Sequence, residues 1–315
     1  ARAAKLTTKS PQTLGLACGE LMPWFQHGPS PELPGDQRAD DGQSLCFDSA
    51  PLAKDIEILG TAAMELVLAV DKPVAFICAR VCDVAPDGAS TRVTYGIFNL
   101  THVNGSDKVT RLTPGKEYKV RVPLIDTAYS FAKGHRIRVA LSTTYWPLIW
   151  PSPEPVTLTL VAGRSALVLP VRPRAKADDR PPRFKAPESA PAFTRTALTA
   201  GGRNRTIHTD LGKGETVVEI VDSSGRNRYD EIDLVAEARS RERYSVRDDD
   251  PLSTTAEVTW TWEFERKDWR IRTESRTHVS CTKREFVVRA RLEAYEGESR
   301  VFERDFEERV PRNGT

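Results

Sequence analysis

The second half of the chain alternates apolar and polar side chains at every other position. Between residues 257 and 265, two tryptophans, a valine and a phenylalanine alternate with threonines and glutamates, and residues 286–294 and 232–238 repeat this pattern. A period of two is typical of a β-sheet with one apolar and one solvated face. We therefore expect an antiparallel meander over residues 195–315, either open or closed into a barrel or half-barrel.

The first half contains shorter β-branched and aromatic runs, separated by turn signals such as Pro86-Asp87-Gly88 and Lys133-Gly134. The predicted strands are Ser44 to Asp48, Met64 to Asp71, Val74 to Val84, Thr91 to Leu100, Tyr118 to Asp126, Arg136 to Ser142, Val156 to Val161 and Ala166 to Val171. No amphipathic helix lies among them, which favours a two-sheet sandwich, and a jelly roll is a common solution at this size. The expected fold class is all-β, with a jelly-roll sandwich over residues 44–172.

Proline marks the segments outside the two halves. Residues 173–194 contain Pro181, Pro182 and Pro187 among charged residues, and this composition predicts an extended linker. Residues 1–43 are also proline-rich, so we expect an irregular segment wrapped on the sandwich. A chain of 315 residues fits two domains, given about 150 residues per domain.

The charge balance argues against several classes of partner. The chain has 46 basic and 44 acidic residues, a net charge of +2, and the two signs are interleaved in the second half. This pattern predicts neither nucleic-acid nor anionic-membrane binding. Five scattered cysteines favour reduced thiols in a cytoplasm over a disulfide framework. The N-terminus, which lacks methionine and an apolar targeting region, has the features of a cut end.

The sequence contains no recognisable catalytic machinery. The nucleophile elbow of an α/β-hydrolase, Gly-x-Ser-x-Gly, does not occur, and the nearest string, residues 221–225, reads as a hairpin turn. No histidine among His27, His102, His135, His208 and His278 has a nucleophile and an orienting acid nearby in sequence. We expect no catalytic residue and no cofactor in this chain.

Metal binding is also weakly indicated. Cys78 and Cys82 lie in one predicted strand, where their sulfurs would be about 13 Å apart, too far to share a zinc ion. The acidic groups Asp36/Asp40/Asp41 and Asp248/Asp249/Asp250 could offer oxygen ligands to a structural calcium, but they lack the spacing of an EF-hand loop. Roles in turns and in solvation are favoured, and no metal site is assigned.

The first half resembles a known family. The strings that carry the resemblance are FDSAPLAKDIEILGTAAMELVLAVDKP, ARVCDVAPDGASTRVTYGIFNLTH and YSFAKGHRIRVALSTTYWPLIWPSPEP. Their specific features are Pro51-Leu52 before a strand ending at Gly60, Asp83-Val84 before Pro86-Asp87-Gly88, and Gly134-His135-Arg136 opening a strand. Over residues 44–172 the chain resembles the C-terminal β-domain of the bacterial Xaa-Pro dipeptidyl-peptidase and cocaine esterase family, whose members are α/β-hydrolases.

The resemblance implies a galactose-binding-like jelly roll that packs against an α/β-hydrolase domain and its cap. It implies that the chain is the non-catalytic C-terminal region of a serine hydrolase of dipeptidyl-peptidase or esterase type, inactive alone, which buttresses the catalytic domain and shapes access to its site. The implied partners are those catalytic and cap domains, with self-association as a further option. The main alternative is a stand-alone carbohydrate- or ligand-binding sandwich, since fold alone does not settle function. An enzyme of unfamiliar chemistry is less favoured.

One loop is unusual enough to be a candidate interaction site. Residues 144–151 place large apolar side chains between prolines that forbid regular helix. We predict that four of them form a docking or ligand patch: Tyr145, Trp146, Leu148 and Trp150. A sugar-stacking platform is one variant, and a loop folded over the sandwich core is the structural alternative.

Overall fold

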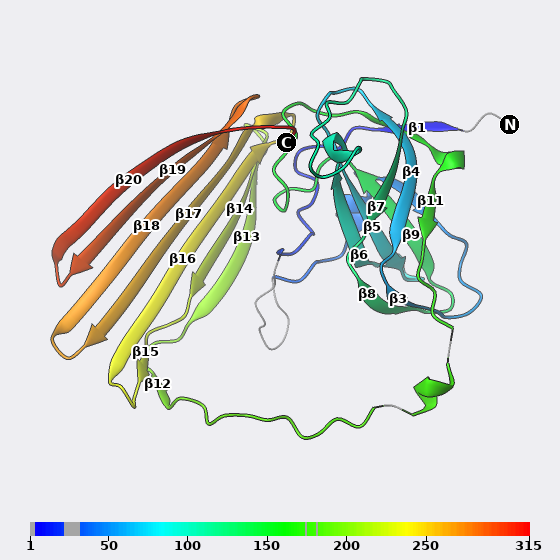
Figure 1. Cartoon of the computed structure of the whole chain (residues 1–315). Coiled ribbons are helices and arrows are strands. Elements are labelled where there is room, and N and C mark those ends of the chain that lie inside the picture. Colours follow the sequence, from blue (N-terminus) through cyan, green and yellow to red (C-terminus); the bar gives the residue numbers. More distant parts are fainter. Residues whose placement is uncertain (1–3, 22–31, 174, 181) are drawn as a thin grey trace. The chain divides into compact units, whose positions relative to one another are not determined.

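The protein is described by a computed structural model that covers residues 4–21, 32–173, 175–180 and 182–315 (Figure 1). His27 and much of the predicted wrapping segment lie outside the described residues. The all-β prediction is confirmed, because the only α-helix in the described part is the four-residue α1 (Arg38–Asp41). None of the described helices has the length and apolarity needed to cross a membrane.

The chain divides into two compact units. Unit 1 comprises Ala1–Pro173 together with Val246–Leu252 and Arg312–Thr315, and unit 2 comprises Arg174–Ser245 and Ser253–Pro311. Two short segments that follow residue 195 therefore belong to unit 1. The linker at 173–194 stays a prediction; within it, residues 182–194 are exposed and form no strand.

Unit 1 contains two main antiparallel sheets (Figure 1). The first contains β1 (Lys5–Thr8), β10 (Leu158–Val161), β4 (Ala63–Val70), β11 (Ala166–Val168) and β7 (Tyr118–Pro123). The second contains β2 (Leu45–Asp48), β9 (Arg136–Ser142), β5 (Phe76–Val84) and β6 (Ser90–Asn99). A separate pair is formed by β3 (Ile56–Gly60) and β8 (Thr127–Phe131). All eight strands predicted from the first half are present, with ends shifted by up to three residues.

Alternation along the strands builds the core of unit 1. Every second residue of β4, from Met64 to Val70, and of β5, from Ile77 to Val81, points into one buried apolar cluster, which also takes side chains from β7, β9 and β10. Residues from both sheets meet there, so the two sheets enclose a shared core. The jelly-roll connectivity of this sandwich stays a prediction.

The outer face of β5 is also covered, which is unusual for an antiparallel sheet. All nine residues of β5 are buried. On the side away from the main core, Cys78 packs with Leu14, Cys18 and Tyr145 in a second apolar cluster. Part of the N-terminal segment thus forms a cover over this sheet, and this segment contains two regular elements, β1 and α1. An irregular wrapping segment over the whole of residues 1–43 stays a prediction. The strand β1 pairs with β10 along Lys5 to Thr8 and so covers an edge of the first sheet.

Unit 2 is a nine-stranded antiparallel sheet. Its strands are β12 (Arg195–Ala197), β13 (Gly202–Asp210), β14 (Glu215–Ser223), β15 (Asn227–Tyr229), β16 (Leu234–Arg247), β17 (Asp250–Arg266), β18 (Trp269–Cys281), β19 (Glu285–Glu296) and β20 (Ser299–Pro311). From β16 to β20, consecutive strands are neighbours, so the predicted meander is confirmed. The described strands β13 and β20 do not pair with each other, and the sheet is therefore open rather than closed into a barrel.

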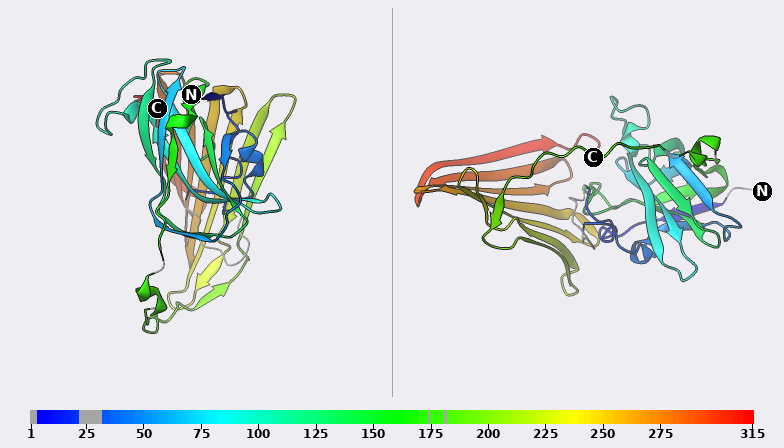
Figure 2. Two further views of the ribbon diagram at one scale, coloured as in Figure 1. Left: turned by 90° about the vertical axis from the view of Figure 1, so that its right-hand side faces the viewer. Right: turned by 90° about the horizontal axis from the view of Figure 1, so that it is seen from below.

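The sheet of unit 2 is a single layer (Figure 2). Both apolar core clusters of the described chain are formed by unit 1 residues. In unit 2, few apolar side chains are fully buried; Val218, Ile220 and Val287 are examples. Cross-strand hydrogen bonds and side-chain pairs, rather than a deep core, hold these strands together.

A close approach between β6 and the end of β7 predicts a glycine-specific position. A Cβ atom added at Gly96 would lie 2.3 Å from the Pro123 carbonyl oxygen and 2.8 Å from Leu124 Cδ2. Gly96→Ala should therefore lower the free energy of unfolding by about 1–3 kcal/mol, since backbone must shift to admit the methyl group. Chemical denaturation followed by fluorescence measures this, with Gly35→Ala, where a Cβ meets nothing within 4 Å, as the control. Equal midpoints for the two variants would contradict the overpacking argument.

Candidate docking surfaces

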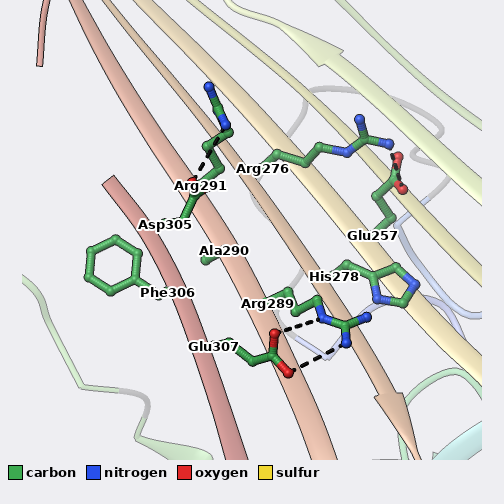
Figure 3. Close-up of a pocket in the computed structure, with 9 residues that line it drawn as sticks. All are labelled: Glu257, Arg276, His278, Arg289, Ala290, Arg291, Asp305, Phe306 and Glu307. Carbon is green, nitrogen blue, oxygen red and sulfur yellow. Dashed lines mark hydrogen bonds and ion pairs between the residues drawn. The ribbon is translucent and has the colours of Figure 1, made fainter. Parts of the chain in front are cut away.

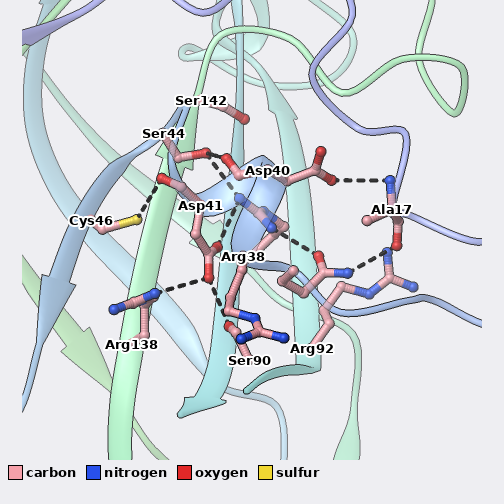
Figure 4. Close-up of polar contacts among 12 residues, drawn as sticks. Ala17, Arg38, Asp40, Asp41, Ser44, Cys46, Ser90, Arg92, Arg138 and Ser142 are labelled. Carbon is pink, nitrogen blue, oxygen red and sulfur yellow. Dashed lines mark hydrogen bonds and ion pairs between the residues drawn. The ribbon is translucent and has the colours of Figure 1, made fainter. Parts of the chain in front are cut away.

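A buried arginine organises the cover on β5. The side chain of Arg80 is 0% exposed, and its Nη2 lies 3.1 Å from Oδ1 of Asp41, which is 3% exposed. Arg80 Nη1 donates a hydrogen bond to Gln37 Oε1 (2.8 Å), and Nη2 donates to Ser44 Oγ (2.9 Å). Since Asp41 belongs to α1 and Gln37 precedes it, one strand residue fixes the position of this short helix. Figure 4 shows Asp41 together with two further partners, Ser90 and Arg138.

Asp41 receives further donors from neighbouring strands. Arg138 of β9 contacts its Oδ2 at 3.1 Å, and Ser90 of β6 donates its hydroxyl to the same atom at 2.7 Å. Arg138 also pairs with Asp48 of β2 at 2.7 Å, and this hydrogen bond lowers the pKa of Asp48. The carboxylate of Asp41 is thus shared among α1, β5, β6 and β9, which compensates the cost of burying charge.

The neighbouring Asp40 anchors the chain that precedes α1. Its two oxygens accept hydrogen bonds from the backbone N–H groups of Gly15 and Ala17, each at 3.3 Å. Burial raises the pKa of Asp40 above its ordinary value. Through these contacts, residues 15–17 are held over the outer face of the sheet.

These contacts separate the acidic residues that were considered as calcium ligands. Asp36 pairs with Arg38, Asp40 with backbone amides and Asp41 with arginines. In the other cluster, Asp248 accepts a hydrogen bond from Thr13 Oγ1 at 2.6 Å. Across the described ranges, no group of three or more histidine, cysteine or acidic side chains is arranged to hold a metal ion.

The two cysteines of β5 flank Arg80. Burial raises the pKa of Cys78 to about 12 and that of Cys82 to about 12. Both side chains are therefore neutral thiols near physiological pH, and they act as small packing groups beside the ion pair.

His135 has an acidic partner that the sequence did not reveal. Its Nδ1 lies 2.9 Å from Oδ1 of Asp83, whose Oδ2 accepts a hydrogen bond from the Tyr129 hydroxyl at 2.9 Å. Burial, together with the Asp83 carboxylate, raises the pKa of Tyr129 to about 12. The positions of the two residues could have indicated this contact. Asp83 lies near the end of β5 and His135 immediately precedes β9, and these two strands pair antiparallel. In the described part of the chain no hydroxyl or thiol is hydrogen-bonded to His135, so this cluster ties strand ends together and lacks a nucleophile.

The structure divides the predicted aromatic patch. Tyr145 is 0% exposed and Trp146 is 2% exposed. The backbone N–H of Trp146 donates to the Leu14 carbonyl at 2.8 Å, and Arg92 Nη1 donates to the Tyr145 hydroxyl at 2.6 Å. Gly15 permits this packing, since a Cβ there would lie 2.3 Å from the Trp146 carbonyl oxygen and its φ is +122°. Tyr145 and Trp146 therefore face the N-terminal cover.

The other two members of the patch, Leu148 and Trp150, are half-buried. Leu148 packs against the second apolar cluster, and both side chains keep part of their surface accessible. The docking role of the loop stays a prediction, and these two residues are the ones whose accessible surface could serve it.

One face of the unit 2 sheet carries paired charges. A shallow pocket of about 590 Å³ lies on this face. Arg276 pairs there with Glu257 at 3.0 Å and Arg289 with Glu307 at 3.3 Å, beside His278 (Figure 3). Because acid and base alternate across neighbouring strands, the face presents neutralised pairs rather than a field of one sign. The expectation of a solvated charged face fits this arrangement.

The opposite face of the same sheet is apolar and partly exposed. Trp260, Trp262 and Phe264 of β17 stack on one another with ring centroids 6.0 and 6.2 Å apart. Trp262 is 43% exposed and Phe306 of β20 is 41% exposed. Exposed aromatic groups of this kind are enriched at protein interfaces.

The buried ion pair predicts a large effect of a single substitution. Arg80→Met should lower the free energy of unfolding by about 3–5 kcal/mol, because the Asp41 carboxylate would remain buried with one partner fewer. Arg38→Met is the matched control: its ion pair with Asp36 is exposed, so its loss should cost less than about 1 kcal/mol. Urea denaturation of both variants measures the difference. Similar losses for the two would show that the Arg80 contact does not hold the cover in place.

Comparison with known proteins places these features in a family. The family described as the X-Pro dipeptidyl-peptidase C-terminal non-catalytic domain matches residues 3–210. The cocaine esterase of Rhodococcus sp. (strain MB1 Bresler) is 28% identical over 116 residues, which are 36% of this chain and 20% of that protein. An aminopeptidase from the marine sediment archaeon Thaumarchaeota archaeon is similar in structure, with a TM-score of 0.46 and 18% identity over 55% of this chain and 34% of that one.

An α-amino acid ester hydrolase gives a TM-score of 0.45 and 19% identity over 55% of this chain and 33% of its own. The chain thus spans about a fifth of the length of the esterase that it matches. The family match extends over more than half of the 315 residues. The chain therefore belongs to the family of X-Pro dipeptidyl-peptidase C-terminal non-catalytic domains.

Proposed function

We propose that this chain is the C-terminal region of a serine hydrolase of dipeptidyl-peptidase or esterase type, and that it buttresses the catalytic domain and shapes access to its site. The observation that carries the proposal is the match of residues 3–210 to a domain family described as non-catalytic. The cocaine esterase that resembles the chain over 116 residues is a hydrolase by name. The substrate class proposed for the whole protein is accordingly an ester or an amide.

The packing of unit 1 suits a supporting role. The strand β5 is buried on both faces, and Arg80 and Asp41 tie it to the N-terminal cover. Such doubly covered sheets resist local opening, since many buried contacts must break together. A domain of this kind can hold a neighbouring domain in a fixed position, and the accessible parts of Leu148 and Trp150 are the surface proposed for that contact.

The alternative of a carbohydrate-binding module gains little from the apolar cavity of unit 1. A cavity of about 410 Å³ opens between β2 and β9 on one side and β4 and β10 on the other. Its lining is mainly aliphatic, and the acidic residue at its edge, Asp48, is held by Arg138. Sugars need several hydrogen-bonding groups and an aromatic stacking surface, so this cavity does not favour a sugar ligand.

A cytoplasmic location belongs to the same proposal. None of the five cysteines, all of which lie in the described ranges, forms a disulfide. Reduced thiols are typical of a cytoplasm, where disulfides are rarely maintained.

The first functional prediction concerns activity. The chain alone should hydrolyse neither p-nitrophenyl esters nor Xaa-Pro dipeptide anilides above background, because it has no nucleophile elbow. A chromogenic assay measures this, with a polypeptide that also carries a hydrolase domain as the positive control. Turnover that a serine-directed inhibitor abolishes while labelling this chain would refute the proposal.

The second concerns docking. Leu148→Glu and Trp150→Glu should each weaken binding of this chain to its hydrolase and cap domains at least about tenfold, because a carboxylate would be buried at the contact. Calorimetry with the separately expressed domains measures the affinity. Leu211→Glu is the control, since Leu211 is 90% exposed in the turn after β13. If all three variants bind as the unaltered chain does, the loop is not the docking surface.

A further inference from the structure

The strand β20 forms one edge of the unit 2 sheet. It runs from Ser299 to Pro311 and pairs on one side with β19, while its other side has no partner strand in the described part of the chain. All thirteen residues are exposed. A long edge strand offers a row of backbone donors and acceptors to any strand that can align with it.

Charges on one face of β20 are paired within the chain. Residues directly opposite in paired strands share a face of the sheet. The odd-numbered residues of β20 from 303 to 309 are charged and share a face with charged residues of β19. Four ion pairs join the two strands on this face: Arg291–Glu303, Arg291–Asp305, Arg289–Glu307 and Glu285–Arg309. The charged side chains in these four pairs therefore have partners of opposite charge within the chain.

The even-numbered face of β20 is different. Phe302, Phe306 and Val310 alternate there with Arg304 and Glu308. Arg304 lies opposite Leu292, and Glu308 lies opposite Val288. In the described residues neither charge has an ion-pair partner, although the Arg304 guanidinium lies 4.7 Å from the ring centroid of Phe306. The two charges stand two residues before and two residues after Phe306.

This symmetry has a direct geometric consequence. If a second β20 aligned antiparallel with Phe306 opposite Phe306, then Arg304 would face Glu308 of the second copy, and the same contact would occur twice. Phe302 would face Val310 of the second copy, also twice. The apolar faces of the two sheets would lie on the same side, because opposite residues in an antiparallel pair share a face.

We propose that β20 pairs with β20 of a second copy of this chain, in an antiparallel two-fold arrangement centred on Phe306. Arg304 and Glu308, which have no ion-pair partner in the described residues of one chain, then form ion pairs with Glu308 and Arg304 of the second copy. The pair joins two nine-stranded sheets into one continuous sheet, and the contact is isologous, as closed dimers require.

Other registers do not place Arg304 opposite Glu308 of the second copy. Centring the pair on Asp305 would place Arg304 opposite Phe306, and centring it on Glu307 would place Arg304 opposite Val310. A shift by an odd number of positions would set the apolar face of one copy beside the charged face of the other. On the charged face, the Phe306-centred register sets Asp305 opposite Glu307 of the second copy. Each of these acids has an arginine partner in its own chain, Arg291 for Asp305 and Arg289 for Glu307, which reduces the repulsion between them. The charges of β20 are therefore complementary in only one of these registers. On other edge strands, charges that have no complement on the partner strand prevent pairing.

The test uses charge reversal on the full chain, with dimerisation measured by sedimentation over the micromolar range. Unaltered chain should dimerise. Arg304→Glu and Glu308→Arg should each raise the dimer dissociation constant at least about tenfold, because each creates two like-charge contacts across the edge. The double variant, with both charges exchanged, should restore the original value.

Mixing gives a sharper test of the register. The Arg304→Glu chain presents only acids at these two positions, and the Glu308→Arg chain presents only arginines. An equimolar mixture should therefore form heterodimers more tightly than either variant forms homodimers. Lys213→Glu, at an exposed turn of the opposite edge (side chain 75% exposed), makes the same change of net charge as Arg304→Glu and should not alter dimerisation. Circular dichroism confirms that each variant keeps its strands.

Three results would overturn the proposal. These are a monomeric unaltered chain, dimers that tolerate either single reversal, and single-reversal variants whose mixture does not associate. Dimers insensitive to Arg304 but lost in Trp150→Glu would assign self-association to the loop at residues 144–151 instead.

Discussion

The ion pair of Arg80 and Asp41 is the constraint on which unit 1 depends. The guanidinium of Arg80 is 0% exposed. Burying it without partners would strongly destabilise the fold, because moving one charge out of water costs several kcal/mol. Its partners come from the segment before β2, so the strand and the N-terminal cover stabilise each other. Once α1 is fixed by Asp41, Asp40 holds residues 15–17 over the sheet through two backbone hydrogen bonds. The burial of Tyr145 and Trp146 follows, since Leu14 and Gly15 then lie against the loop that contains them.

Unit 2 solves the same problem of sheet stability in another way. Its described residues contribute to neither of the apolar core clusters, and its strands of up to 17 residues are held by long hydrogen-bonded ladders. Ion pairs cross from strand to strand on one face, and stacked aromatic rings line the other. Each pair contributes only about 0.2–1 kcal/mol, but many act together along a long meander. The consequence is a sheet whose apolar face and edge remain accessible.

The sequence predicted most strands because alternation is a local signal. The eight strands expected in the first half and the meander in the second are all present. The resemblance of three sequence strings, one of which contains Gly134-His135-Arg136, led to the correct family. The features that the sequence did not reveal have a common physical cause. Tyr145 and Trp146 were grouped with Leu148 and Trp150 because all four belong to one short segment that contains Pro147 and Pro151, whereas their burial depends on Leu14 and Gly15, about 130 residues earlier in the chain. The partnership of His135 with Asp83, and the short strand β1, are likewise set by residues far apart in sequence. The single-layer nature of unit 2 escaped prediction because alternation shows that a face is apolar, not whether anything covers it.

The two units therefore differ in how much apolar surface they offer for binding another molecule. Unit 1 encloses Tyr145 and Trp146, and its predicted docking loop retains only the partly accessible Leu148 and Trp150. Unit 2 exposes aromatic residues along β17 and β20, and truncation of such residues commonly costs most of the affinity at an interface. The family match ends at residue 210, the last residue of β13, so it covers the main segment of unit 1, up to residue 173, and only the beginning of unit 2. A domain with the fold of unit 1 can support a catalytic neighbour through shape and rigidity. The specificity of assembly, by contrast, should depend on residues such as Arg304, Phe306 and Glu308, which lie beyond the part of the chain that the family describes.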